Sequence, residues 1–442
     1  MNKKLFSIIV VVVFCLFSSN LYAETVYSLY DLCKIADSNA IKIKIAQDNL
    51  YISKQDKKRA LAVLIPTLSA FGSKNRTSSE YENPTPIYKM DGTKDTDTLG
   101  IRVDQSFTLN GKELTALKVT KDEIEKTEYN LEATRSNYMF EIAKNYYQIL
   151  SAKKNVDISF ADVKRLEKHK NSVNEKLQVG TVTKTALFRA EAEYSKSKTN
   201  LLKAQNAFNL AKASLKNLVD VEEDFSLVEE QLFYLKGSEF SYDSLIKEAI
   251  ENRPELKSVT KTQEVAKKTI SYERGSYWPT ISFIGMYTNS DVDSNYDPQF
   301  SAYDSETDLK EKSIEAKVTF TIFDGGLRSA QVKQAIARKR QADAGLIDAT
   351  NEIILESKKA WYDFQTAKST IETLKDELKS ASENFNAVTM QFEYGLADSV
   401  DMMDADALLV TAQRKLAEAE FDYEVTVLDI FRIKGKLLEL LL

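Results

Sequence analysis

The chain contains one sequence pattern twice, and this duplication limits the folds that it can adopt. At a shift of about 213 residues Leu32 matches Leu245, and by Ala190 and Ala405 the shift has grown to 215, as small insertions between two copies would cause. Other matched pairs are Lys34 and Lys247, Ala36 and Ala249, Asn39 and Asn252, Pro66 and Pro279, Gly72 and Gly285, Gly111 and Gly325, Tyr147 and Tyr362, and Gly180 and Gly395. Copies of about 210 residues are far longer than the repeats of solenoids or propellers. We therefore expect a duplicated domain, with copies at residues 24–236 and 237–442.

Long segments without proline and nearly without glycine predict long helices, because both residues interrupt regular structure. Between Gly111 and Gly237 there is no proline and the only glycine is Gly180. In the second copy the segment from Gly326 to Leu442 has no proline and only Gly345, Gly395 and Gly435, with Gly395 at the place that matches Gly180. Each copy should thus contain a shorter helix and two strands, then a long helix, a turn and a second long helix that runs back. Residues 112–177 as one helix would be about 100 Å long.

Apolar residues recur every seven positions along these segments, which is typical of helices packed side by side as in coiled coils. The outgoing helix of the first copy carries Leu117, Ile124, Leu131 and Tyr138, then Ile142, Ile149, Val156 and Val163. The return helices carry Leu187, Tyr194, Leu201, Phe208 and Leu215 in the first copy and Met402, Leu409, Leu416, Tyr423 and Ile430 in the second. The pattern predicts two long helical hairpins.

Before each long helix, apolar and polar side chains alternate, as in strands with one apolar face. The apolar positions are Leu99, Ile101, Val103, Phe107 and Leu109 in the first copy, and Ile314, Ala316, Val318, Phe320 and Ile322 in the second. Partner strands should begin after Pro66 and Pro279. The polar segments 73–98 and 289–311 are expected to be loops at the hairpin ends. The sequence thus predicts four strands.

An apolar strand face can pack on a protein core or face lipid in a membrane β-barrel. The four predicted rods leave little globular core for such a sheet to cover, which favours the membrane interpretation. Four strands cannot close a barrel, because the smallest known have about eight. Several copies of the chain would have to combine their strands, and three copies would supply about twelve.

The N-terminus has the pattern of a secretory signal peptide at residues 1–23. Lys3 and Lys4 precede an apolar run, and Ala23 supplies a small residue at the expected cleavage site. A membrane anchor is the alternative, but an apolar run of about 13 residues is shorter than the roughly 20 that a spanning helix needs. Cleavage removes Cys15 and leaves Cys33 alone, so no internal disulfide is expected. The net charge of -6 would become -8, which argues against a nucleic-acid partner.

Four short motifs, together with the duplication, resemble the TolC family of outer-membrane efflux and secretion ducts over essentially the whole mature chain. They are Trp278-Pro279, Phe323-Asp324-Gly325-Gly326, Tyr394-Gly395, and Val400-Asp401-Met402-Met403-Asp404-Ala405. The resemblance implies a homotrimer with a twelve-stranded β-barrel in outer-membrane lipid and an α-helical barrel tunnel in the periplasm. It also implies a periplasmic adaptor protein and an inner-membrane pump, proton-driven or of the ABC type. The chain would be the exit duct of a tripartite efflux pump or a type I secretion system.

In that family the helix turns at the periplasmic tip form an entrance, and Asp401 and Asp404 match the aspartates that ring it. Gly180 and Gly395 mark the two tip turns. The alternative is that these acids only sit near a helix N-terminus, where the helix dipole favours negative charge and where Asp398 or Ser399 would be the N-cap.

The chain departs from the family at three tip positions. The family's tip arginine falls on Ala397, its tip tyrosine on Phe392, and its first-repeat aspartate on Ala186. The usual locking ion pair and hydrogen bond cannot form from these side chains. Lys184 could supply part of the lock, with a solvated surface lysine as the alternative.

No pattern for catalysis, a cofactor or a metal stands out, and we do not expect an enzyme. His169 is the only histidine and lies between Lys168 and Lys170, so we expect it to be exposed. Tyr146, Tyr147, Trp361 and Tyr362 occupy matched places on the outgoing helices and are expected to pack between neighbours.

Two other classes of protein carry long helical rods. A periplasmic adaptor or coiled-coil tether without a pore would have small β-domains in place of a second hairpin with strands. An adhesin or stalk would lack the amphipathic strands. The sequence does not identify the transported substrate.

Overall fold

A computed structural model describes residues 25–81, 90–221, 225–229, 240–298 and 303–442, and the predicted signal peptide lies outside these ranges. The chain forms two compact units, each assembled from both copies. The helical unit takes in the described parts of Met1–Lys44, Thr134–Arg253 and Ile353–Leu442. The sheet unit takes in those of Ile45–Ala133 and Pro254–Glu352.

The elements of the two copies follow the same order, as the duplication predicts. The matched helices are α2 (Leu29–Asn39) and α6 (Tyr242–Asn252), α3 (Ile41–Ala62) and α7 (Pro254–Gly275), α4 (Lys112–Gln178) and α8 (Leu327–Glu393), and α5 (Lys184–Val219) and α9 (Ser399–Ile433). Helices α4 and α8 both have 67 residues, so the predicted long rods are confirmed. The copy boundaries at 24–236 and 237–442 stay a prediction.

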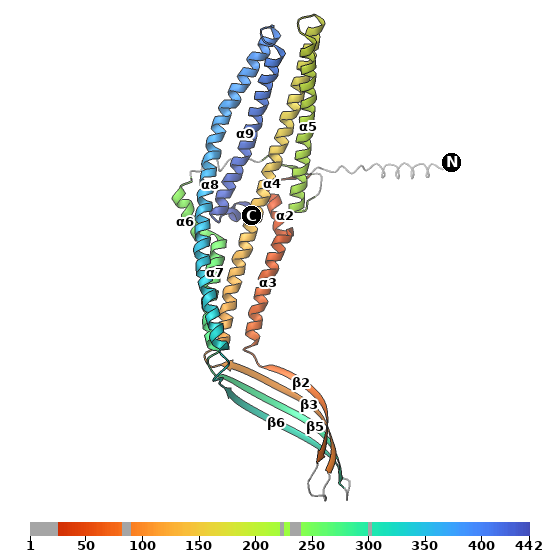
Figure 1. Ribbon diagram of the computed structural model, residues 1–442, viewed down its shortest axis with the longest axis vertical. Helices are drawn as coiled ribbons and strands as arrows, with labels where there is room; N and C mark the ends of the chain where they lie inside the picture. Colours follow the sequence, from red (N-terminus) through yellow and green to blue (C-terminus); the bar gives the residue numbers. More distant parts are fainter. Residues whose placement is uncertain (1–24, 82–89, 222–224, 230–239, 299–302) are drawn as a thin grey trace, which may run out of the picture. The chain divides into compact units, whose positions relative to one another are not determined.

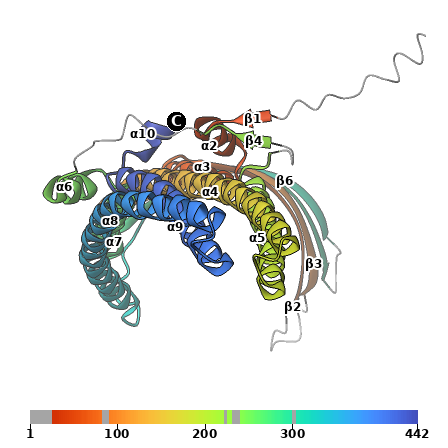
Figure 2. The same ribbon diagram turned by 90° about the horizontal axis from the view of Figure 1, so that it is seen from above.

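In the helical unit, α4 and α5 form one hairpin and α8 and α9 form the other (Figure 1). Seen from above, the hairpins form a curved layer, and α2, α6 and α10 (Leu437–Leu441) lie on its convex side (Figure 2). The short strands β1 (Thr25–Tyr27) and β4 (Phe225–Leu227) pair in parallel on the same side. Leu32 of α2 and Leu245 of α6, a matched pair of the two copies, are both fully buried.

The aromatic residues of the first outgoing helix pack as expected, whereas Tyr362 of the second is 53% exposed on the single chain. Tyr146 and Tyr147 are buried, and their rings meet edge to face at 5.4 Å between centroids. In the second copy Trp361 packs against Tyr362 and against Tyr242 of α6.

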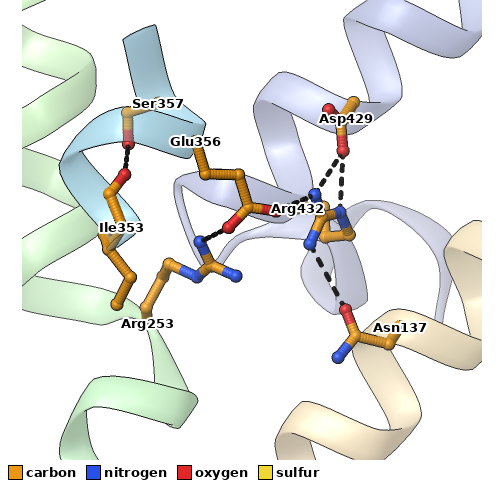
Figure 3. Close-up of polar contacts among 7 residues, drawn as sticks. All are labelled: Asn137, Arg253, Ile353, Glu356, Ser357, Asp429 and Arg432. Atoms are coloured by element: carbon orange, nitrogen blue, oxygen red, sulfur yellow. Dashed lines mark hydrogen bonds and ion pairs between the residues drawn. The ribbon is translucent and has the colours of Figure 1, made fainter. Parts of the chain in front are cut away.

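A polar network joins four helices near the base of the second hairpin (Figure 3). Glu356 of α8 accepts hydrogen bonds from Arg253, which follows α6, and from Arg432 of α9, the latter at 2.6 Å. Arg432 also pairs with Asp429 at 2.7 Å and reaches Asn137 of α4 at 3.4 Å. Burial alone would raise the pKa of Glu356, but the two arginines outweigh it and hold the pKa below its usual value. The network fixes α8 and α9 to α6.

The sheet unit contains one antiparallel sheet with the strand order β2-β3-β5-β6. Its strands are β2 (Thr67–Tyr81), β3 (Met90–Thr108), β5 (Thr280–Pro298) and β6 (Tyr303–Thr319). The register places apolar residues of neighbouring strands opposite each other, for example Leu68 and Val103, Ile101 and Tyr287, Phe107 and Ile281, and Ile281 and Val318. One apolar face therefore crosses all four strands. Ile314 is 92% exposed and Leu99 69% exposed on the single chain.

The expectation that segments 73–98 and 289–311 are loops is wrong, because the strands continue through most of both. Polar side chains pair across the strands: Arg76 with Asp95, Lys74 with Asp97 at 3.1 Å, and Thr98 with Ser290 at 3.0 Å. Such cross-strand pairs stabilise a sheet without an apolar face. Residues 82–89 and 299–302, between the strands, lie outside the described residues.

In the part of the chain that the structure describes, no helix is both long and apolar enough to cross a membrane.

Replacing Glu356 by Gln should destabilise the helical unit, because two guanidinium groups lose their shared carboxylate. We expect a loss of about 2 kcal/mol, less than for a fully buried pair because the Glu356 side chain is one-third exposed. The measurement is denaturant unfolding in detergent. Glu141→Gln, which removes the exposed pair with Lys42, should cost less than about 1 kcal/mol.

The difference in unfolding free energy between wild type and Glu356→Gln should become smaller as the pH falls. The pKa of Glu356 is lowered in the native state, so its stabilising effect is complete above the unfolded pKa of about 4.3. This effect is lost as the pH falls through the lower native pKa. A difference in unfolding free energy that stays the same at all acidic pH values would contradict a lowered pKa of Glu356.

Candidate functional site

Both long outgoing helices end at a glycine in the left-handed conformation, and these turns form the tips of the two hairpins. Gly180 has φ of 77° and Gly395 has φ of 76°, which side chains with a Cβ adopt only with strain. The return helices then begin at side-chain N-caps, Thr183 for α5 and Asp398 for α9. The predicted turn positions thus coincide with the tips.

Asp401 and Asp404 are both exposed in the first turns of α9. The carboxylate of Asp401 accepts a hydrogen bond from the backbone N–H of Asp398 at 3.0 Å, while Asp398 accepts from the N–H groups of Val400 and Asp401. Of the two N-cap candidates, the structure therefore selects Asp398. Asp401 closes a capping box and Asp404 does not belong to it, so the two carboxylates have different local roles.

The three positions that depart from the family come together at the tips. Phe392 is buried with Val173, Ala190 and Met402, and Ala186 and Ala397 pack against this group. We call this group the tip cluster. The contact between the two hairpins at these positions is therefore apolar. Lys184 is exposed at the first residue of α5.

A cavity of about 760 Å³ opens beside the tip cluster and is bounded by both hairpins. Lys176 and Arg189 line it from the first hairpin, and Asp398 and Asp401 line it from the second. Opposite charges thus face one another across the gap between the tips.

Lys176 joins the hairpins through a carbonyl group. Its Nζ donates to the carbonyl oxygen of Phe392 at the end of α8 and lies 4.1 Å from the centroid of the Phe392 ring. A cation at the C-terminus of a helix is favourable, because the last carbonyl groups carry partial negative charge.

The expectation that His169 is exposed is wrong. The residue is 3% exposed, its Nε2 lies 2.8 Å from Ser399 Oγ of α9, and its ring lies 5.0 Å from that of Phe392. Burial lowers the pKa of His169, as does the charge of Lys176, while Asp406 acts in the opposite direction. His169 therefore favours the neutral form and links α4 to α9.

A second polar contact lies further from the tips. Arg165 Nε of α4 donates to Asp406 Oδ1 of α9 at 2.6 Å, and Arg165 Nη2 lies 3.7 Å from Asp162 Oδ1. Burial, followed by the neighbouring Asp406, raises the pKa of Asp162 to about 7. Arg414 Nη2 donates to Ser159 Oγ at 2.9 Å. We call these links, with those of His169 and Lys176, the polar seam.

Sequence reasoning missed the polar seam, although a signal was present. Asp162, His169 and Lys176 recur at intervals of seven on α4, and Ser399 and Asp406 do so on α9. This is the spacing that predicted the apolar packing, and it also places polar residues on one face of a helix.

The described residues offer no place for metal or thiol chemistry. Within the ranges given above, no three His, Cys, Asp or Glu side chains are placed to hold a metal ion. Burial raises the pKa of Cys33 to about 12, so its thiol stays protonated and unreactive.

Two long hairpins from two copies, joined to a four-stranded sheet with an apolar face, match a known protein family. The family model described as outer membrane efflux protein covers residues 37–220 and 245–436. The chain belongs to this family. It is therefore an outer-membrane channel protein, and the predicted function and location are confirmed.

Individual proteins agree with the family assignment. The outer membrane protein TolC of Vibrio cholerae is 20% identical over 439 residues, which cover 99% of this chain and 96% of TolC. The CmeC outer membrane channel of Campylobacter jejuni has a TM-score of 0.80 at 16% identity and covers 92% of this chain and 86% of CmeC. VceC, an outer membrane protein of Vibrio cholerae, has a TM-score of 0.76 at 19% identity, over 92% and 96% of the two chains. The expected fold class, mainly α-helical with a membrane β-barrel part, is thus confirmed.

Asp398→Ala should loosen the start of α9, because the backbone N–H groups of Val400 and Asp401 lose their acceptor. We expect a local loss of about 1 kcal/mol, seen as faster amide hydrogen exchange in residues 400–404. Asp398→Asn keeps a side-chain oxygen and should exchange almost as slowly as the wild type. Equally fast exchange in the two variants would show that the cap is not responsible.

Proposed function

We propose that the chain is one protomer of a homotrimer in which the strands of three copies close a single barrel in the outer membrane. The observation that carries this proposal is the open sheet. Among the strands that the structure describes, β2 and β6 each pair with one neighbour, so no described strand covers their outer edges. Exposed edges of this length favour pairing with another strand, and in lipid every backbone group must be paired.

The apolar face of the sheet supports the same arrangement. Its side chains lie opposite each other across four strands, and many are more than half exposed in the single chain. A closed barrel would place this face against lipid, where apolar side chains are stable. Three copies would supply about twelve strands, within the range of known membrane barrels.

We infer that the hairpin tips form the entrance of the channel and that Asp401 and Asp404 line it. Both carboxylates are exposed, and they lie three residues apart on α9 beside the Gly395 turn. In a trimer the two residues of each protomer would gather carboxylates around one axis. Their mutual repulsion would favour the binding of cations.

The partners we propose are those of the family resemblance: a periplasmic adaptor protein and an inner-membrane pump, proton-driven or of the ABC type. The chain would act without catalysis as the exit duct of an efflux pump or of a type I secretion system. A periplasmic adaptor or tether is the alternative function, and a four-stranded sheet with an exposed apolar face does not suit it.

The purified mature protein should have the mass of three chains in detergent and should conduct ions in planar lipid bilayers. The physical reason is that a single chain leaves its sheet edges and apolar face uncovered. A water-soluble monomer that does not enter lipid would overturn the proposal.

The double variant Asp401→Ala and Asp404→Ala should lose the block of single-channel current that a trivalent cation causes in the wild type. Because Asp401 also caps α9, the single variant Asp404→Ala serves as the matched test outside the capping box. It should weaken the block at least several-fold without changing the helix start. Unchanged block in both variants would remove the aspartates from the entrance.

A further inference from the structure

Neighbouring rows of cross-strand partners show where the apolar face of the sheet ends. Toward the C-terminal ends of β2 and β5, the first of these rows has no polar side chain and consists of Leu68, Val103, Gly285 and Ile314. The next two rows each end in a lysine of β6, and they are Ala70, Ile101, Tyr287 and Lys312, then Gly72, Leu99, Asn289 and Lys310. The row after them is wholly charged and consists of Lys74, Asp97, Asp291 and Asp308. The two middle rows therefore form the border between the apolar face and the charged end of the sheet.

A groove of about 460 Å³ lies at this border. Ala70 and Gly72 of β2 leave the space, because neither has a side chain larger than a methyl group. Leu99 and Ile101 of β3 and Tyr287 of β5 line the groove with apolar surface. A groove of this composition suits an apolar chain better than a polar ligand.

Two lysines of β6 lie beside the groove. Lys312 Nζ is 5.9 Å from the centroid of the Tyr287 ring, which itself lines the groove. Lys310 is the cross-strand partner of Asn289, another lining residue, and such partners have Cβ atoms about 5 Å apart on one face of a sheet. Both lysines are exposed, and neither has an ion-pair partner among the described residues. Two unpaired ammonium groups beside an apolar groove favour a ligand with an anionic group.

Asn289 adds an acceptor that lacks a donor. Its Oδ1 is buried and has no hydrogen-bond partner within the part of the chain that the structure describes. A buried acceptor without a donor is costly, because it has lost its bonds to water. A hydroxyl or N–H group of a ligand would remove this cost once the amide turns into the groove.

We propose that the groove binds one lipid that carries a phosphate group with a hydroxyl or N–H donor close to it. An acyl chain lies along Ala70 and Gly72, the phosphate pairs with Lys310 and Lys312, and the donor bonds to Asn289. This site rests on the proposed function, since the apolar face must lie against lipid before a lipid can enter the groove.

The position of the groove favours a lipid over free phosphate. In the proposed barrel the apolar face spans the hydrocarbon part of the membrane, and headgroups lie where that face becomes polar. Lys310 and Lys312 are at this level of the sheet. The carboxylates of Asp291 and Asp308 in the next row repel a phosphate, so the headgroup is confined to the groove side of the lysines.

The test is native mass spectrometry of the mature protein in nonionic detergent, titrated with one of two lipids that have the same acyl chains. Phosphatidylglycerol carries hydroxyl groups close to its phosphate, whereas phosphatidylcholine carries a quaternary ammonium group and no hydroxyl. EDTA is present, so that divalent cations do not bridge a phosphate to Asp291 and Asp308. One phosphatidylglycerol per chain should bind before any further lipid, and more tightly than phosphatidylcholine.

The double variant Lys310→Gln and Lys312→Gln should bind phosphatidylglycerol roughly 25-fold more weakly, because each basic side chain near a lipid surface contributes about fivefold. Lys317→Gln is the matched control. It removes a charge from the same strand, but residue 317 pairs with Ser282 on the opposite face of the sheet. It should bind phosphatidylglycerol as the wild type does.

Ala70→Leu fills the groove without removing a charge and should weaken the binding of phosphatidylglycerol at least several-fold. This variant covers the case in which the double lysine variant does not fold. Inorganic phosphate in large excess should not displace the lipid.

Equal affinity of the wild type for the two lipids would overturn the lipid site. An unchanged preference for phosphatidylglycerol in the double lysine variant, or displacement of the lipid by inorganic phosphate, would also overturn it. The mass in detergent and the conductance in phosphatidylcholine bilayers are measured on the same preparations. Particles of three chains that conduct but do not select phosphatidylglycerol would overturn the site alone, whereas single chains that do not conduct would overturn the proposed function itself.

Discussion

Side-by-side packing of long helices is the interaction on which the helical unit depends. An isolated helix gains little stability from its own backbone, and most of the stability of a helix in a protein comes from packing one face. Here the outgoing and return helices cover one another's apolar stripes, and Tyr146, Tyr147 and Leu215 are almost completely buried. The tips, the cavity beside them and the polar seam all lie on this framework. Their geometry is therefore set by the register of the hairpins.

The polar contacts between the long helices described above lie at a few positions along their length, and the charged groups that take part differ between these positions. Near the base of the second hairpin, Glu356 is shared by two arginines and its charge is compensated. Nearer the tips, Arg165 pairs with both Asp406 and Asp162. The group shared between two partners is thus an acid near the base and an arginine nearer the tips. The apolar tip cluster around Phe392 adds a contact that does not depend on pH.

Much of the fold could be predicted from the sequence, because its signals are periodic and occur twice. The proline-free segment after Gly111 placed α4 at residues 112–177, one residue short of its observed end, and Gly180 and Gly395 marked the turns. The ends of the strands could not be predicted, because pairs such as Lys74 and Asp97 are polar in sequence and become cross-strand partners only in the sheet. The exposure predicted for His169 was wrong for a related reason. Lys168 beside it is exposed, and Lys170 reaches the Tyr194 ring of α5 with its Nζ, so charged neighbours do not show that the residue between them is exposed.

The way in which the compact units are assembled bears on how this chain could have arisen. Each unit takes helices or strands from both halves of the sequence, so a single half supplies only part of either core. A half-length ancestor could have completed these cores only by associating with a second identical subunit. Fusion of the two genes would then have turned a contact between subunits into one within a chain. After the fusion each half could change independently of the other. The single histidine, on α4 opposite a serine of α9, is one such difference between the halves, and two identical subunits could not differ in this way.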